Sequence, residues 1–220
     1  MSTLSIVDCE KSMSRAVSTQ NPLKRPRALR LDPARRKALL IQAGVQVFAR
    51  RGIGASRPTD VAKEAGVAEA TIYTYFASRE ALVAEVLDEV ARYYEELIRS
   101  ALGVANGSVA ERLTELVERV ADSIDRDPNY ARVWFNWSSA TRADIWPRFL
   151  DAETRIISGV TETIRDAPNG EFAAVGIHPQ DIARLLLGCA EMIARIKFAD
   201  RPPAEVRRFI QSALVLILRT

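Results

Sequence analysis

The chain has 220 residues, of which 48% are hydrophobic, with two cysteines and one histidine. This length allows one or two compact domains with ample apolar residues for a core, which excludes a disordered or collagen-like chain. Metal, disulfide and haem sites have too few ligands, and a Ser/His/Asp hydrolase would depend on His178 alone. We therefore expect no enzyme, metal or cofactor. Charged residues near the N-terminus and the lack of a long apolar run predict a cytoplasmic protein.

The charge is unevenly divided along the chain. Residues 1–51 contain 11 Lys and Arg against 3 Asp and Glu, a net charge of +8. Residues 52–103 have a net charge of −4, and residues 104–220 have −1. A local basic excess beside a nearly neutral remainder indicates a surface for polyanions, with nucleic acid first and an anionic membrane second.

Residues 1–31 are polar and without period, so we expect a flexible basic arm. Its cations gather in one short run, at Lys24, Arg25, Arg27 and Arg30. The alternative is a solvated tail that binds nothing.

The next segments predict a helix-turn-helix. Asp32-Pro33 is a helix start signal, and Gly52 ends that helix. Two short helices follow, Pro58 to Ala65 and Glu69 to Phe76, with Gly66 in the turn between them. Ser78 then caps a helix that reaches about Ala101, roughly 35 Å at 1.5 Å per residue.

The remaining chain also shows helical periodicity, so the fold class is all-α. Ser108 and Glu111 form a capping box before a helix to about Asp125, another helix starts at Pro128, and a third covers Asp144 to Asp166. The last two helices carry an apolar stripe that is wider than one core needs, which predicts a dimer interface. Its residues are Ile182, Leu186, Cys189, Ile193, Phe209, Ala213 and Ile217. The alternative is that both helices are buried in a larger monomer core.

Two stretches carry a resemblance to a known family. Asp60 to Val67 reads DVAKEAGV, and Thr71 to Leu82 reads TIYTYFASREAL. They resemble the DNA-binding domain of TetR-family transcriptional regulators, including the turn glycine and the start of the linker helix. Further segments are similar to the LuxR/HapR-type quorum-sensing regulators of vibrios: Lys24 to Arg27 (KRPR), Val47 to Gly54 (VFARRGIG) and Val133 to Phe149.

The resemblance implies a homodimer in which the last two helices of each chain form a four-helix bundle. It implies a basic arm at residues 1–31, a helix-turn-helix domain at 32–78 and a helical ligand-binding and dimerisation domain at 79–220. A two-fold dimer would place its recognition helices in successive major grooves of a near-palindromic operator. The regulator could repress or activate, as this subgroup does.

The resemblance also implies site residues. Its DNA-facing positions correspond to Ala70, Thr71, Tyr73, Thr74, Tyr75 and Arg79, and its arm enters the minor groove, for which Arg25 and Arg27 are our first choices. Tyr73 could instead pack against the first helix. Ala68, Glu69 and Pro58 depart from the family pattern, which predicts an altered sequence preference.

The implied effector is a small hydrophobic molecule. The pocket positions correspond to Trp134 and Phe149, with Tyr94 and Ile98 facing them from the linker helix. Aromatic residues at helical spacing can equally be core. The second reading of the chain is a helical small-molecule-binding protein or enzyme that uses this cavity, and the third is a membrane-surface protein held by the arm.

Overall fold

The structure is a computed structural model that describes residues 32–103, 107–167 and 177–218. Residues Pro33–Thr220 cluster as one unit, separate from residues 1–32. The described residues contain helices and no strand, which confirms the all-α prediction. None of these helices is long and apolar enough to cross a membrane. The arm cations Lys24, Arg25, Arg27 and Arg30 lie outside the described residues.

The first three helices form the predicted helix-turn-helix and its support. They are α1 (Pro33–Arg51), α2 (Pro58–Glu64) and α3 (Glu69–Tyr75). Gly66 lies in the turn between α2 and α3 with φ +65°, a left-handed conformation that favours glycine. Ile72 and Phe76 are buried and Val67 is half-buried, so α3 is held by one apolar face.

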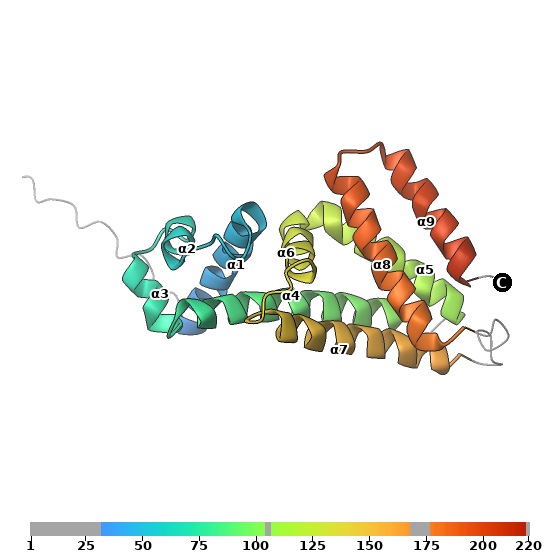
Figure 1. Cartoon of the computed structure of the whole chain (residues 1–220), viewed down its shortest axis with the longest axis horizontal. Helices are drawn as coiled ribbons and strands as arrows, with labels where there is room; N and C mark the ends of the chain where they lie inside the picture. The colour runs from blue at the N-terminus through green and yellow to red at the C-terminus, as the bar shows by residue number, and fades with distance from the viewer. Residues whose placement is uncertain (1–31, 104–106, 168–176, 219–220) are drawn as a thin grey trace, which may run out of the picture. The chain divides into compact units, whose positions relative to one another are not determined.

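The long helix α4 (Arg79–Leu102) connects this head to the other helices (Figure 1). Ser78 caps it, because its Oγ accepts from the Ala81 N–H at 3.2 Å. The remaining helices are α5 (Val109–Arg126), α6 (Pro128–Ser138), α7 (Trp146–Arg165), α8 (Pro179–Phe198) and α9 (Pro203–Leu218). α4 and α7 lie side by side, and α8 packs against α5, α7 and α9.

Local signals set most helix ends. The predicted capping box opens α5, with the Ser108 N–H donating to Glu111 Oε2 at 2.7 Å. The predicted start of α7 at Asp144 was two residues too early. Asp144 instead pairs with Arg142 at 2.7 Å, and the helix begins at Trp146, beside Pro147.

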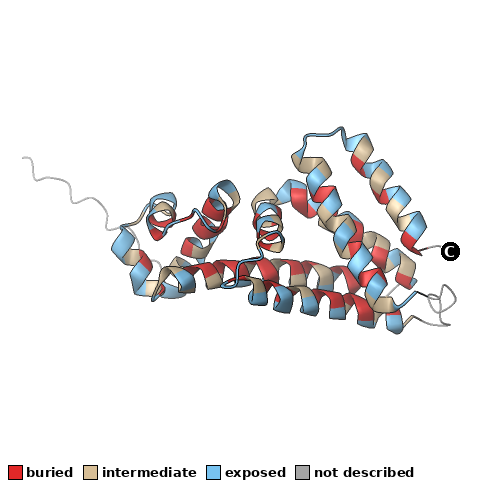
Figure 2. Cartoon of the chain, viewed as in Figure 1, coloured by how far each residue is buried: buried red, intermediate tan, exposed pale blue. Residues whose placement is uncertain are grey.

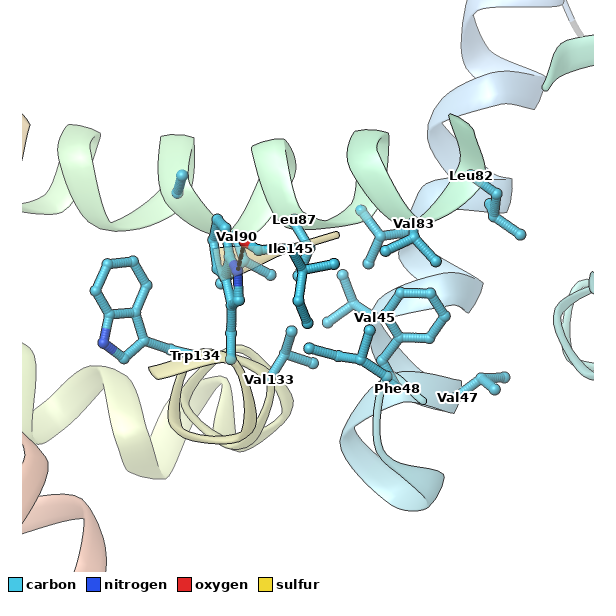
Figure 3. Close-up of a cluster of buried hydrophobic side chains, with 14 of the residues drawn as sticks. Val45, Val47, Phe48, Leu82, Val83, Leu87, Val90, Val133, Trp134 and Ile145 are labelled. Atoms are coloured by element: carbon cyan, nitrogen blue, oxygen red, sulfur yellow. Dashed lines mark hydrogen bonds between the residues drawn. The ribbon is translucent and has the colours of Figure 1, made fainter. Parts of the chain in front are cut away.

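Two hydrophobic clusters form the core, and buried residues follow the inward faces of the helices (Figure 2). The first cluster includes α1, α2 and α3 together with the first half of α4, α6 and the start of α7. Figure 3 shows Val45 of α1 pointing toward Leu87 of α4 and Val133 of α6, with the Phe48 ring beside it on the Val83 side. The expected boundary after residue 78 coincides with the start of α4, yet the core continues across it.

Gly44 allows the close approach of α1 to α4. A Cβ atom at this position would lie 2.5 Å from Cγ2 of Val86, which is fully buried and stiff at χ1. Gly44→Ala should therefore lower the free energy of unfolding by about 1–2 kcal/mol, because overpacking outweighs the gain in helix propensity.

Denaturant unfolding at fixed protein concentration measures the change in the free energy of unfolding. Gly159→Ala in α7 is the control, since nothing lies within 4 Å of its new Cβ. That variant should gain roughly 0.5–1 kcal/mol from helix propensity. An unchanged or raised stability for Gly44→Ala would mean that α1 and α4 can separate at no cost.

Candidate nucleic-acid interface

The outer face of α3 presents small and polar side chains to solvent. Ala70, Tyr73 and Thr74 are exposed at i, i+3 and i+4 spacing, and Tyr73 is 51% exposed. Tyr73 therefore does not pack into the core. Thr71 and Tyr75 are half-buried, and Tyr75 packs against the first hydrophobic cluster. The side chains predicted to face DNA thus divide into an exposed strip and two flanking positions.

The N-cap of α3 is Ala68, which offers no side-chain acceptor. Thr74 Oγ1 donates to the Ala70 carbonyl at 3.2 Å within the helix. Glu69 is exposed in the first turn and forms no ion pair with any described residue. Ala68 and Glu69, two of the three departures from the family pattern, are therefore both exposed at the start of α3.

The acidic residues of α2 are paired with arginines at the end of α1. Arg50 bonds Glu64 at 2.7 Å, and Arg51 bonds Asp60. These pairs fix α2 on α1 and offset the two carboxylates. Exposed Arg57 and Lys63 have no carboxylate partner among the described residues, so α2 and its N-cap keep two unpaired cations.

Sequence reasoning missed Arg57 as a candidate contact. It is the N-cap residue of α2, and its N–H donates to Asp60 Oδ2 at 3.0 Å. Its position just before Pro58 at the start of the first helix of the motif was the available signal. That proline is buried and forms the first turn of α2.

Arg79 is engaged with the protein's own backbone. Its Nε donates to the Ser56 carbonyl at 3.2 Å, and its Nη2 donates to the carbonyls of Ile53 and Gly54 at 2.9 and 3.3 Å. The side chain thus ties the start of α4 to the loop between α1 and α2. The resemblance places Arg79 among the DNA-facing positions, and in this structure only its Nη1 donors have no backbone carbonyl partner.

A cavity of about 70 Å³ lies among α4, α5, α6, α7 and α8. Tyr94, Ile98 and Trp134 line it, together with Phe135 of α6. Burial raises the pKa of the Tyr94 phenol, which therefore stays neutral at physiological pH. The described residues contain no cluster of His, Cys, Asp or Glu that could hold a metal.

Phe149, which the resemblance placed in the pocket, is not among the residues that line this cavity. It is 3% exposed and lies in an aromatic cluster, with ring centroids 5.4 Å from Trp134, 5.6 Å from Trp137 and 5.2 Å from Trp146. Trp134 lines the cavity and its ring contacts Phe149, so Phe149 supports the wall without lining it. The helical spacing of the aromatic residues could not distinguish these two places.

Four of the residues predicted in the dimer interface are buried within their own chain. Ile182, Leu186, Ile193 and Ile217 are each at most 8% exposed, because they pack in the second hydrophobic cluster of their own chain. Cys189, Phe209 and Ala213 are half-buried. The exposed apolar residues of α8 and α9 are Leu185, Met192, Val215 and Leu216, with exposed fractions of 50, 44, 70 and 66%.

Comparison with known proteins gives a family match for the helix-turn-helix part of the chain. Residues 40–86 match the model for bacterial regulatory proteins of the tetR family. This segment contains α2 and α3, so the similarity to the family includes the helix-turn-helix.

Several relatives match over more than half of this chain. LuxR of Vibrio harveyi, an HTH-type transcriptional regulator, is 37% identical over 127 residues, which are 58% of this chain and 61% of LuxR. The transcriptional repressor KstR2 of Mycolicibacterium smegmatis is 32% identical over 124 residues, 56% of this chain and 59% of KstR2. The matches thus span about 60% of the length of these relatives.

Solved structures support the fold. The fatty acid degradation regulator FadR of Bacillus halodurans has a TM-score of 0.70 and 20% identity, over 86% of this chain and 96% of that one. FadR of Bacillus subtilis in complex with stearoyl-CoA has a TM-score of 0.69 and 18% identity, over 83% and 97%. The likeness extends through the helices beyond the family match.

The contacts of Arg79 lead to a test of its role. Arg79→Lys keeps the positive charge but loses the planar fork that reaches three carbonyls. It should lower the free energy of unfolding by roughly 1–2 kcal/mol, since each neutral acceptor contributes about 0.5–1.5 kcal/mol and the site is partly exposed.

Denaturant unfolding measures the free energy of unfolding of Arg79→Lys and of a control variant. Arg99→Lys is the control, because Arg99 is an exposed residue whose i,i+3 ion pair contributes little. If Arg79→Lys is as stable as the wild type while its DNA affinity falls, the role of Arg79 is phosphate binding after all.

Proposed function

We propose that this chain is a homodimeric transcriptional regulator of the TetR family that binds near-palindromic operator DNA. The observation that carries the proposal is the exposed strip of Ala70, Tyr73 and Thr74 on the second helix of a helix-turn-helix. This helix enters the major groove and reads base edges. Thr74 and Tyr73 offer hydroxyls for hydrogen bonds, while the Thr methyl and Ala70 suit contact with thymine.

Phosphate contacts position the recognition helix. Arg57 and Lys63 are exposed cations of α2 and its N-cap, without carboxylate partners in the described part of the chain, so both are available to phosphates. Thr71 and Tyr75 flank the strip and can reach the backbone through their hydroxyls. The basic arm, with Arg25 and Arg27, follows the minor groove, where guanidinium is attracted to a narrow A·T-rich track.

The dimer forms through α8 and α9. Leu185 and Met192 lie seven residues apart on α8 and so share a face, and Val215 and Leu216 are the most exposed large apolar residues of α9. Cys189, Phe209 and Ala213 complete the patch. Burying it in a two-fold interface between four helices removes this apolar surface from water.

A small apolar effector in the cavity would change DNA affinity through α6. Ala131 and Trp134 line the cavity, while the adjacent Tyr130 hydroxyl accepts from Gln42 of α1 at 2.8 Å and donates to Glu89 of α4 at 3.0 Å. A displacement of α6 is therefore transmitted to α1, which carries the helix-turn-helix. The effector can change DNA affinity only if it binds more tightly to the dimer at one distance between its two helix-turn-helix domains than at another.

The proposed biological role is based on similarity to the relatives described above. Similarity to LuxR over 127 residues supports the LuxR/HapR-type assignment, and with it a role in quorum sensing. Named repressors among the relatives support repression at some promoters. The protein acts in the cytoplasm, at the nucleoid.

The recognition strip can be tested with DNA selected from a random library. Tyr73→Ala and Thr74→Ala should each weaken specific binding about tenfold, because each removes contacts to bases, and should leave unfolding unchanged. Fluorescence anisotropy measures the affinity. Thr154→Ala on exposed α7 is the matched control and should bind normally.

The same assay tests the arm. Removing residues 1–31 should reduce the slope of log K against log salt by at least about two, since each lost phosphate contact contributes roughly 0.9. Binding that is absent, or that is insensitive to salt, would contradict DNA-directed function. An unchanged slope after truncation would contradict only the role of the arm.

The dimer surface has its own test. Val215→Glu should convert the dimer to a monomer, because a carboxylate would be buried without a partner in the apolar interface. Light scattering after size-exclusion chromatography measures the mass. Leu150→Glu, at a 40% exposed position of α7, is the control and should stay dimeric. A dimeric Val215→Glu protein would exclude this patch as the interface.

A further inference from the structure

The cavity wall carries a single charged side chain. Of the residues that line it, only Glu191 of α8 is charged, and most of the others are aliphatic or aromatic. The polar groups besides this carboxylate are the Tyr94 hydroxyl and the Trp134 indole N–H, neither of which is cationic. An apolar site with one carboxylate should prefer a ligand whose polar group is positively charged.

Glu191 is half-buried and forms no ion pair with a described residue. The cations near it on α8 are otherwise engaged. Arg184 bonds Asp181 at 2.9 Å, and the guanidinium of Arg195 lies over the ring of Phe135 at 4.6 Å from the centroid. Neither arginine lines the cavity. The carboxylate is therefore left at the wall without a counter-ion.

A second carboxylate, which is outside the cavity lining, interacts electrostatically with Glu191. Glu153 of α7 is half-buried, and its pKa is raised first by burial and then by the negative charge of Glu191, against the effect of Arg184. The two acids thus lie close enough to repel each other. A cation placed between the apolar wall and Glu191 would relieve this repulsion.

We infer that the cavity takes a compact apolar ligand carrying one cationic group, such as an aralkyl amine, with the cation bound by Glu191. The inference rests on the proposed use of the cavity as an effector site. The cavity volume of about 70 Å³ sets the size. A water molecule needs roughly 10–15 Å³ of such volume, so several water-sized groups fit, which suits one ring with a short chain.

The ring would lie against Trp134 and Phe135, and the aliphatic side chains of α5 would cover its other side. An anionic ligand would instead bring its charge to an unpaired carboxylate with no lining cation to receive it. A neutral ligand would gain the apolar contacts alone.

Three probes of matched shape test the charge preference: 2-phenylethylamine, 2-phenylethanol and phenylacetate. Isothermal titration calorimetry with the full-length protein should rank the amine first, about fivefold above the alcohol and at least about tenfold above phenylacetate, as expected for a charge-assisted contact. Glu191→Gln should abolish the preference while keeping the alcohol's affinity. Glu162→Gln, on the exposed face of α7, is the matched control and should keep the preference.

A cavity-filling variant shows where the probes bind. Ala190→Leu narrows the cavity from its wall and should weaken binding of all three. If no probe binds the wild type, the cavity is not an effector site and the proposed regulation fails. If phenylacetate or the alcohol binds as tightly as the amine, or if Glu191→Gln keeps the preference, the cationic class is wrong while the effector site stands.

Discussion

The packing of α1 against α4 and α6 is the contact on which the rest of the structure depends. Gly44 brings α1 onto Val86, and Val45 points toward Val133. The recognition helix has only seven residues and rests on this platform through Ile72 and Phe76. A helix so short has little stability of its own, so its orientation is set by the platform beneath it.

The same packing connects the cavity wall to the helices that support α3. Trp134 belongs to the first hydrophobic cluster and also lines the cavity, so the cluster and the cavity wall share this side chain. Densely packed interfaces tend to hold discrete arrangements and do not deform gradually. The proposed effector would therefore favour one arrangement of α6, and the hydrogen bonds of Tyr130 would transmit that arrangement to α1 and α4. The proposed regulation depends on this continuity, because the first hydrophobic cluster extends from α1, α2 and α3 into α4, α6 and α7.

Much of the fold was predictable because its signals are local. Caps at Ser78 and Ser108 and the turn at Gly66 act within a few residues, and the alternation of Ile72 and Phe76 with polar neighbours fixes the exposed face of α3. The inward face of α8 was not predictable in the same way. That helix is apolar around most of its circumference, so periodicity could not separate buried Ile193 from exposed Met192. Contacts made across long sequence separations were equally hidden, including those of Arg79 with the α1–α2 loop and of Phe149 with Trp134.

The position of the tryptophans has a practical consequence. The chain has three, and Trp134, Trp137 and Trp146 all gather around Phe149 in one aromatic cluster. The Trp137 indole donates to the Ile145 carbonyl at 3.0 Å, which fixes its ring there. The tryptophan emission of the whole protein therefore originates in this cluster, which includes the cavity-lining Trp134. An unlabelled sample thus contains its own optical reporter of the region through which the cavity and the helix-turn-helix would communicate.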